Sequence, residues 1–127
     1  MTRQAVSTSN APAAIGPYSQ GIITDGFVFC SGQIGLDPAT GTLVDGLEAQ
    51  TERVLKNIAA ILDAAGLTLA DIVKTTIFLT DMADFATVNG IYAKHVADPP
   101  PARSTLAVSA LPKGAVIEIE AIARRPA

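Results

Sequence analysis

The stretch DGLEAQTERVLKNIAAILDAAG, residues 45 to 66, predicts one long amphipathic helix. Its apolar face repeats at the three- and four-residue spacing of a helix, while charged and amide side chains fill the opposite face. Asp45, with Glu48 three residues later, is typical of a capping box, and Gly66 is typical of a helix end. The apolar face consists of Leu47, Thr51, Val54, Leu55, Ile58, Ile61, Leu62 and Ala65. We expect a helix of about eighteen residues whose apolar face covers a sheet.

The residues before this helix have the pattern of an antiparallel hairpin. In YSQGIITDGFVFCSG, residues 18 to 32, two apolar runs are separated by Asp25-Gly26, a dipeptide that favours tight turns. We expect strands at Tyr18 to Thr24 and Phe27 to Ser31, with a short edge strand at Gln4 to Ser7.

The residues after the helix predict another strand and another helix. DIVKTTIFLT is short and β-branched, which predicts a strand at Ile72 to Thr80. DMADFATVNGIYAKHV, residues 81 to 96, then has the helical spacing of Phe85, Val88, Tyr92 and Val96. We expect about twelve helical residues, ended by Asp98 and three prolines that cannot continue a helix.

Two further strands are expected at Arg103 to Ser109 and Ala115 to Ala123. Helices that interrupt a sheet with both hairpins and crossovers indicate an α+β fold, a mixed sheet with two helices on one face. The length favours a single domain, residues 1–127.

The amino-acid composition limits the classes of molecule that this chain is expected to bind. The chain is 49% hydrophobic and 17% charged, so part of its apolar surface is expected to meet another subunit. A net charge of −3 and the lack of a basic run argue against nucleic acid. The N-terminal residues contain no apolar run typical of a signal peptide or a membrane span, so we expect a cytoplasmic protein without membrane contact.

The single cysteine and the single histidine leave few options for metal or nucleophilic chemistry. Cys30 has no partner for a disulfide and reads as a small buried hydrophobe. His95 has no second imidazole for a metal site, and a surface or capping role is expected for it. We therefore predict no metal site and no Ser-His-Asp triad.

The strand that begins at Arg103 carries the strongest candidate for ligand binding. Alternation puts Arg103 and Thr105 on one face and Ser104, Leu106 and Val108 on the other, and the apolar set is expected under the helices. The same argument turns Glu118 and Glu120 away from the helices, where they could be solvated charges. A guanidinium on a strand can bind one carboxylate with two donors, so Arg103 is a candidate ligand site, with the hydroxyl of Thr105 beside it.

Three other residues are open to two interpretations. Ser31 ends the second hairpin strand and could supply a hydrogen-bonding wall, and Gly32 would let a ligand approach the backbone. Asn89 interrupts the apolar face of the second predicted helix, and it could cap a loop or contact a ligand.

Four motifs, taken together, resemble the RidA family, also called the YjgF/YER057c/UK114 family. They are PARSTLAVSALPKGAVIEIEAIA (101–123), APAAIGPYSQG (11–21), SGQIGLDPATG (31–41) and DIVKTTIFLTDMADFATVN (71–89), in the family's order and spacing. The resemblance implies a chorismate-mutase-like fold and a homotrimer whose sheets form a central barrel, with sites at the subunit interfaces.

The resemblance also implies an enamine/imine deaminase that needs no cofactor and hydrolyses 2-imino acids to 2-keto acids and ammonia. It assigns the carboxylate clamp to Arg103, the water-handling acid to Glu118, and pocket positions to Tyr18, Ser31, Gly32 and Asn89. Many relatives have cysteine at Thr105, which leaves a hydroxyl here, and proline at Gly35, which leaves a loop that could be looser. The rival functions are a non-enzymatic sensor of 2-keto acids, a ribonuclease or translation inhibitor, and a chaperone-like holdase.

Overall fold

The computed structural model describes residues 2–126, which contain one mixed six-stranded sheet in the order β1-β2-β3-β6-β4-β5. Neighbouring strands are antiparallel except β4 and β5, which are parallel. The strands are β1 (Gln4–Val6), β2 (Gly21–Thr24), β3 (Phe27–Gln33), β4 (Ile72–Leu79), β5 (Ala102–Ala107) and β6 (Ile117–Arg124). The prediction of an α+β fold with a mixed sheet is confirmed.

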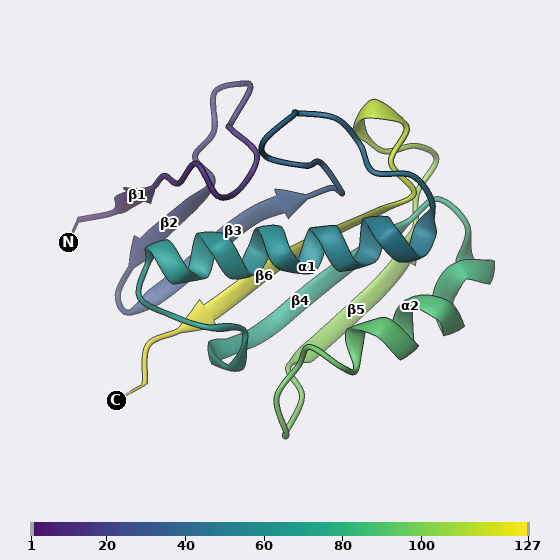
Figure 1. Ribbon diagram of the computed structural model, residues 1–127. Helices are drawn as coiled ribbons and strands as arrows, with labels where there is room; N and C mark the ends of the chain where they lie inside the picture. Colours follow the sequence, from purple (N-terminus) through teal and green to yellow (C-terminus); the bar gives the residue numbers. More distant parts are fainter. Residues whose placement is uncertain (1, 127) are drawn as a thin grey trace.

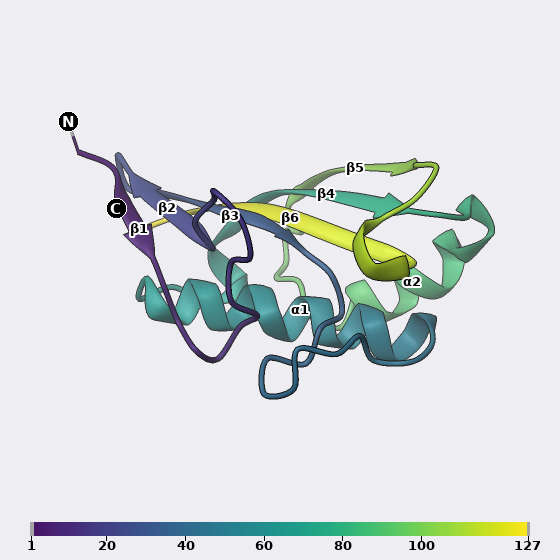
Figure 2. The same ribbon diagram turned by 90° about the horizontal axis from the view of Figure 1, so that it is seen from above.

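Both helices lie on the same face of the sheet, as Figure 2 shows most clearly. α1 (Leu47–Ala64) runs across the middle strands, and α2 (Phe85–Tyr92) lies beside β4 and β5 (Figure 1). Isoleucine, leucine and valine side chains of α1 fill the space above β3, β4 and β6, where the largest of them are fully buried. The sheet's other face carries no helix or strand from residues 2–126.

Local signals placed most of the elements correctly. Asp25 and Gly26 both have positive φ, as the hairpin turn between β2 and β3 requires. Gly66 ends α1 with a φ of 80°, and the N–H of Leu67 donates to the carbonyl of Leu62 across that end. The hairpin, the long helix and its end therefore follow from local chemistry.

Two helix predictions were wrong in detail. The N-cap of α1 is Gly46, with a φ of 93° and no side-chain cap, so Asp45 and Glu48 do not form a capping box. The second helix has eight residues in place of about twelve, because its first turn is the 3₁₀ segment η2 (Met82–Asp84) and the chain leaves the helix after Tyr92. Gly90 lowers the helix propensity of this segment.

Gly35 allows the loop after β3 to pack tightly against α1. A Cβ at this position would lie 2.9 Å from the backbone Cα of Gln50. The side-chain amide of Asn57 on α1 also donates to the carbonyls of Ile34 and Leu36, at 3.2 Å and 3.0 Å. The loop is therefore tied to α1 at this position, and whether it is looser than one with proline stays a prediction.

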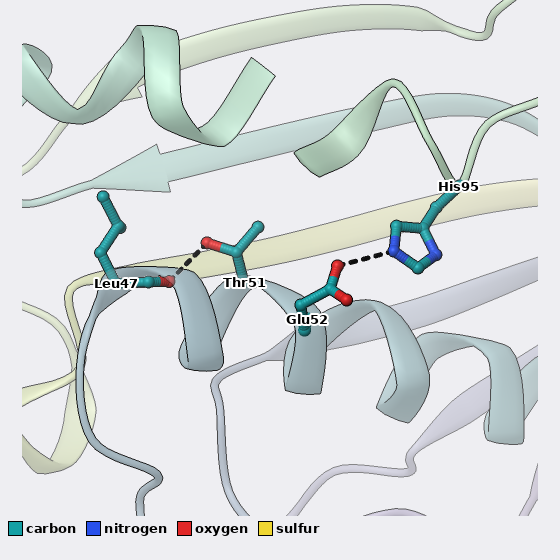
Figure 3. Close-up of polar contacts among 4 residues, drawn as sticks. All are labelled: Leu47, Thr51, Glu52 and His95. Atoms are coloured by element: carbon teal, nitrogen blue, oxygen red, sulfur yellow. Dashed lines mark hydrogen bonds and ion pairs between the residues drawn. The ribbon is translucent and has the colours of Figure 1, made fainter. Parts of the chain in front are cut away.

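His95 links the two helical segments, as Figure 3 shows. Its Nε2 lies 2.7 Å from the Glu52 carboxylate on α1, while the hydroxyl of the neighbouring Thr51 donates to the Leu47 carbonyl.

Cys30 is buried, as predicted, and burial raises the pKa of its thiol to about 12. Within residues 2–126 no helix is both long and apolar enough for a bilayer, and no His, Cys, Asp or Glu side chains cluster as a metal site would require.

Candidate functional site

Arg103 lies on the helix-covered side of the sheet, so its predicted orientation was wrong. On β4, Thr75 pairs with Arg103 and Ile77 pairs with Thr105, and both β4 residues are buried in the core beneath the helices. Leu106, which was expected in the core, points to the open face and is 39% exposed. The physical reason is that the open face also carries exposed apolar side chains, such as Phe29 at 42%, so alternation alone does not identify the core side.

Residues of α2 hold the Arg103 guanidinium. Its Nη1 donates to the Asn89 side-chain oxygen at 2.8 Å. The guanidinium carbon lies 5.2 Å from the centre of the Tyr92 ring and 5.5 Å from that of Phe85, both cation–π distances. These residues lie in or beside an open cleft whose lining is Asn89, Tyr92, Ala93, Val96, Pro100, Pro101 and Arg103. The structure therefore brings together two predicted site residues, Arg103 and Asn89.

Thr105 lies two residues further along β5, on the same face as Arg103. Its hydroxyl oxygen is buried and has no hydrogen-bond partner within residues 2–126. A buried hydroxyl without a partner costs free energy, so this oxygen is suited to a bond that a ligand or another chain supplies.

Glu118 lies on the open face of β6, as predicted, at the inner end of a small pocket. The pocket has a volume of about 130 Å³ and is lined by Pro12, Ala13, Ile15, Tyr18, Gly32, Gln33, Ile34, Leu36, Pro112, Lys113 and Glu118. Burial, and to a smaller extent the charge of Glu120, raises the pKa of the Glu118 carboxyl. The structure thus brings Tyr18, Gly32 and Glu118 together.

Gly32 is the residue against which the Glu118 carboxylate packs. A Cβ at position 32 would overlap this carboxylate, so a larger residue would displace it. The pairing of β3 with β6 also shifts register between Cys30 and Gln33, and such bulges often reorient groups beside functional sites. Glycine and bulge together bring the backbone of β3 close to the acid.

Ser31 fixes the backbone beside Tyr18. Its hydroxyl donates to the Ser19 carbonyl at 2.6 Å, so in this structure its proton is already in use. Ser31 lies in a separate hollow on the open face, which Lys74, Thr76 and Glu120 also line. It was expected as a wall of the pocket, and within this chain it is placed with neither Arg103 nor Glu118.

Gln20 was not predicted, although it fixes the loop that carries Tyr18. Its buried side chain accepts from the N–H of Thr8 and donates to the carbonyls of Thr8, Ala11 and Pro12. Tyr92 and Phe85 contact Arg103, whereas the sequence pattern predicted only that they lie on the apolar face of a helix. Their spacing of seven residues, with Asn89 between them, puts the three on one side of a helix and could have indicated a common site.

The cation and the acid lie too far apart to share one small ligand within a chain. On β4, Thr75 pairs with Arg103 on one side and with Ala121 of β6 on the other, whereas Phe78 pairs with Leu106 and with Glu118 in the same way. Two strand spacings and three residues along the strand put the Arg103 and Glu118 Cα atoms about 14 Å apart, with side chains on opposite faces. We call the Arg103, Asn89 and Thr105 group the cationic half-site, and the Glu118, Gly32 and Tyr18 group the acidic half-site.

Comparison with known proteins gives consistent matches over nearly the whole chain. A family model described as endoribonuclease L-PSP matches residues 8–125. The chain is 57% identical, over 122 residues, to a protein of Arabidopsis thaliana named Reactive Intermediate Deaminase A, chloroplastic; the match covers 95% of this chain and 65% of that longer protein.

A second relative and a solved structure agree with this match. A Homo sapiens protein named 2-iminobutanoate/2-iminopropanoate deaminase is 48% identical over 124 residues, which cover 97% of this chain and 90% of that protein. The crystal structure of RidA from the Antarctic bacterium Psychrobacter sp. PAMC 21119 superposes with a TM-score of 0.94 at 47% identity, covering 96% of this chain and 99% of that one. The fold and the sequence therefore have the same relatives.

Proposed function

Since the chain belongs to the family described as endoribonuclease L-PSP, the RidA/YjgF family, we propose that it is an enzyme that hydrolyses 2-imino acids to 2-keto acids and ammonia. Substrates of the size of 2-iminopropanoate and 2-iminobutanoate suit a pocket of about 130 Å³. The relatives named for this activity in Homo sapiens, Rattus norvegicus and Mus musculus support the reaction class.

The observation that carries the proposal is that the Arg103 cation and the partly buried Glu118 acid lie apart within one chain. Hydrolysis of an imino acid needs both groups, since the substrate carboxylate must be held while water attacks the adjacent carbon. Because the two half-sites of one chain lie on opposite faces of the sheet, we propose that a complete site forms between two copies. The exposed apolar side chains of the open face suit burial against other copies of the chain, and we propose a homotrimer in which three sheets form a central barrel and the clefts between chains hold the sites.

In the cationic half-site, Arg103 binds the substrate carboxylate. The guanidinium offers two parallel N–H donors, which match the two oxygens of a carboxylate. The unpartnered hydroxyl of Thr105 donates to the same substrate, and the backbone N–H of Gly32 on the other chain is a further donor. Fixing the acid group in this way puts the C=N carbon at one defined place, which lowers the entropic part of the barrier.

In the acidic half-site, Glu118 moves protons. The carboxylate takes a proton from water as the oxygen bonds to C2, and the electron pair of the C=N bond passes to nitrogen. The protonated Glu118 then returns its proton to the amino nitrogen, and its carboxylate takes the hydroxyl proton as the C–N bond breaks, the keto oxygen forms and ammonia leaves. A raised pKa lies closer to the working pH, so the carboxylate accepts a proton more readily in the first step and can still return it in the second. Tyr18 closes the pocket over the imine.

A mixing experiment tests the shared site. Arg103→Ala and Glu118→Gln proteins are each assayed for pyruvate release from freshly generated 2-iminopropanoate, against the uncatalysed rate in buffer. They are then unfolded together and refolded as a mixture. A site built from two chains recovers activity in about one quarter of the sites, because some interfaces receive an intact Arg103 and an intact Glu118. If wild type hydrolyses the imine and the mixture recovers nothing, the shared site is wrong.

The same assay separates catalysis from binding alone. A protein that only senses 2-keto acids would bind pyruvate through Arg103 and leave the rate of imine loss at the buffer value. Wild-type rates above that value, lost in Arg103→Ala with the circular dichroism spectrum unchanged, support the enzyme.

A further inference from the structure

We propose that Tyr92, held in place by Thr75, is a positioning residue that orients the Arg103 guanidinium toward the substrate carboxylate. The inference rests on the proposed function, since it assigns Arg103 to carboxylate binding. It adds two residues that act through Arg103 and whose contribution is measurable separately.

The contacts of Tyr92 are at both ends of its side chain. Its ring lies beneath Arg103, with 5.2 Å between the ring centre and the guanidinium carbon. Its hydroxyl and the Thr75 hydroxyl form a hydrogen bond of 2.6 Å inside the core, where Thr75 is 1% and Tyr92 5% exposed. The ring is therefore held at its far end and cannot slide along the guanidinium face.

The hydrogen bond ties the ring to the strand beside the arginine. Thr75 is the β4 residue that pairs with Arg103 on β5, and both point to the helix side. The bond thus fixes the distance from α2, which carries Tyr92, to the sheet at the position of Arg103. Two hydroxyls in an apolar core gain little over an apolar pair of the same shape, so the gain in geometry is the better reason for them.

The arrangement leaves most N–H donors of the Arg103 guanidinium available to a ligand. Within residues 2–126, Asn89 is the one hydrogen-bond acceptor that contacts Arg103, and it occupies Nη1. The guanidinium carbon lies over the Tyr92 ring, 5.2 Å from its centre, and the ring carries no hydrogen-bond acceptor of the amide or carboxylate kind on that side. Nη2 and Nε therefore have no acceptor within residues 2–126 and remain available for two carboxylate oxygens.

The test combines four variants with one change of cation. Tyr92→Leu removes the aromatic face, Tyr92→Phe and Thr75→Val each remove one hydroxyl, and Val88→Ala is a control that damages the same helix without contacting Arg103. Each is measured in wild type and in Arg103→Lys, by titration with pyruvate and by imine kinetics. Lysine carries a point charge without a plane, so it has nothing for the ring to orient.

We expect Tyr92→Leu to raise KM and the pyruvate Kd about tenfold while kcat changes less than about threefold, because ground-state and transition-state binding lose the same contact. In Arg103→Lys the same substitution changes Kd by less than about twofold. Tyr92→Phe and Thr75→Val raise Kd about threefold each, and the double variant no further, because they share one hydrogen bond. Val88→Ala lowers Tm and leaves Kd and KM unchanged.

Two results would overturn the inference without affecting the proposed function. In the first, Tyr92→Leu lowers Tm and leaves Kd and KM unchanged. In the second, Tyr92→Leu raises the pyruvate Kd tenfold in wild type and by the same factor in Arg103→Lys. A Tyr92→Leu protein that does not fold leaves the decision to Tyr92→Phe and Thr75→Val, whose unchanged Kd would equally overturn it. Pyruvate binding that survives Arg103→Ala would contradict the proposed function itself, and the positioning role with it.

Discussion

The two half-sites differ in how completely their own chain holds the charged group. The Arg103 guanidinium donates a hydrogen bond to Asn89 and has two aromatic rings against it before any ligand arrives. The Glu118 carboxylate packs on Gly32, and its raised pKa comes from lost hydration and, to a smaller extent, from the charge of Glu120. The guanidinium is held in place by its neighbours, whereas the carboxylate is destabilised as an ion.

This difference matches the two tasks of an imine hydrolase. A group that binds a carboxylate benefits from rigidity, because each rotamer frozen in advance need not be frozen on binding. A group that exchanges protons with water benefits from a pKa closer to the working pH, which burial supplies. The comparison therefore predicts that damage to the cationic half-site appears in binding and that damage to the acidic half-site appears in turnover.

Replacing Arg103 gives the largest expected effect. Arg103→Ala removes two charge-assisted hydrogen bonds of about 2 kcal/mol each, which corresponds to roughly a 10³-fold loss in kcat/KM. Arg103→Lys keeps the charge and one donor, so it should lose roughly tenfold to a hundredfold, mostly through KM. The measurement is imine hydrolysis over a range of substrate concentrations. A loss confined to kcat would break the division of tasks between the half-sites.

Glu118→Gln is the converse substitution. We expect kcat to fall roughly 10²-fold, at the lower end of general-base effects, because a protonated imine is already electrophilic. The pyruvate Kd should change less than about threefold. In wild type, activity falls as the pH drops through the pKa of Glu118, above the ordinary glutamate value of 4.5. Loss of this acid limb in the glutamine variant, seen in a pH–rate profile, would sharpen the assignment.

The fold was largely predictable from short-range signals. The Asp25-Gly26 turn, the period of α1 and the β-branched run of β4 each depend on neighbours in sequence. The end of α2 depends instead on the chain packing back toward α1, where His95 meets Glu52 at a separation of 43 residues. No local sequence pattern indicates that contact, so the sequence predicts a second helix longer than the one observed.

The site was predictable as a set of residues and not as an arrangement. Alternation separates Arg103 and Thr105 from Ser104 and Leu106 with certainty, but it does not tell which set faces the helices. Hydrophobicity favours Leu106 over Arg103 for the helix side, and this prediction is wrong for two reasons. The open face also carries exposed apolar side chains, and on the helix side Tyr92 offers the arginine an aromatic surface. The proposed second chain makes an apolar open face reasonable.

Gly32→Ala tests whether the acid depends on the close backbone. The added Cβ overlaps the Glu118 carboxylate, so the carboxylate must turn away from its place. We expect roughly a tenfold loss in kcat, with the pyruvate Kd within about twofold of wild type. Gly26→Ala is unsuitable as a control because Gly26 has a φ of 78°, whereas Gly90→Ala lies in α2, meets no neighbour and should retain full activity. An unaltered kcat in Gly32→Ala would remove Gly32 from the acidic half-site.

The stability of the fold should respond to Glu118 in the opposite direction to activity. A carboxyl whose pKa is raised in the folded state holds its proton more tightly there than in the unfolded chain, so the wild type loses stability as pH rises from the unfolded pKa through the folded one. Glu118→Gln cannot ionise and escapes this loss. Thermal unfolding should therefore give the variant a higher Tm than wild type at pH 7 and a smaller advantage at pH 4. A variant less stable than wild type at both pH values would mean that the carboxylate is satisfied in the folded protein.

The smallest effect is expected from the ion pair outside both half-sites. The Glu52 carboxylate and the His95 Nε2 lie 2.7 Å apart, a contact marked by a dashed line in Figure 3, but the two side chains are 47% and 26% exposed, and water screens such a pair. Glu52→Gln should cost less than about 1 kcal/mol of unfolding free energy and leave kcat and KM unchanged, because no residue of either half-site contacts the pair. Urea unfolding in low and high salt measures this cost, which should shrink further as salt screens the charges. A change in KM would instead show that the segment after α2 transmits strain from α1 to Asn89, and the cationic half-site would then be less independent of its surroundings than its three contacts indicate.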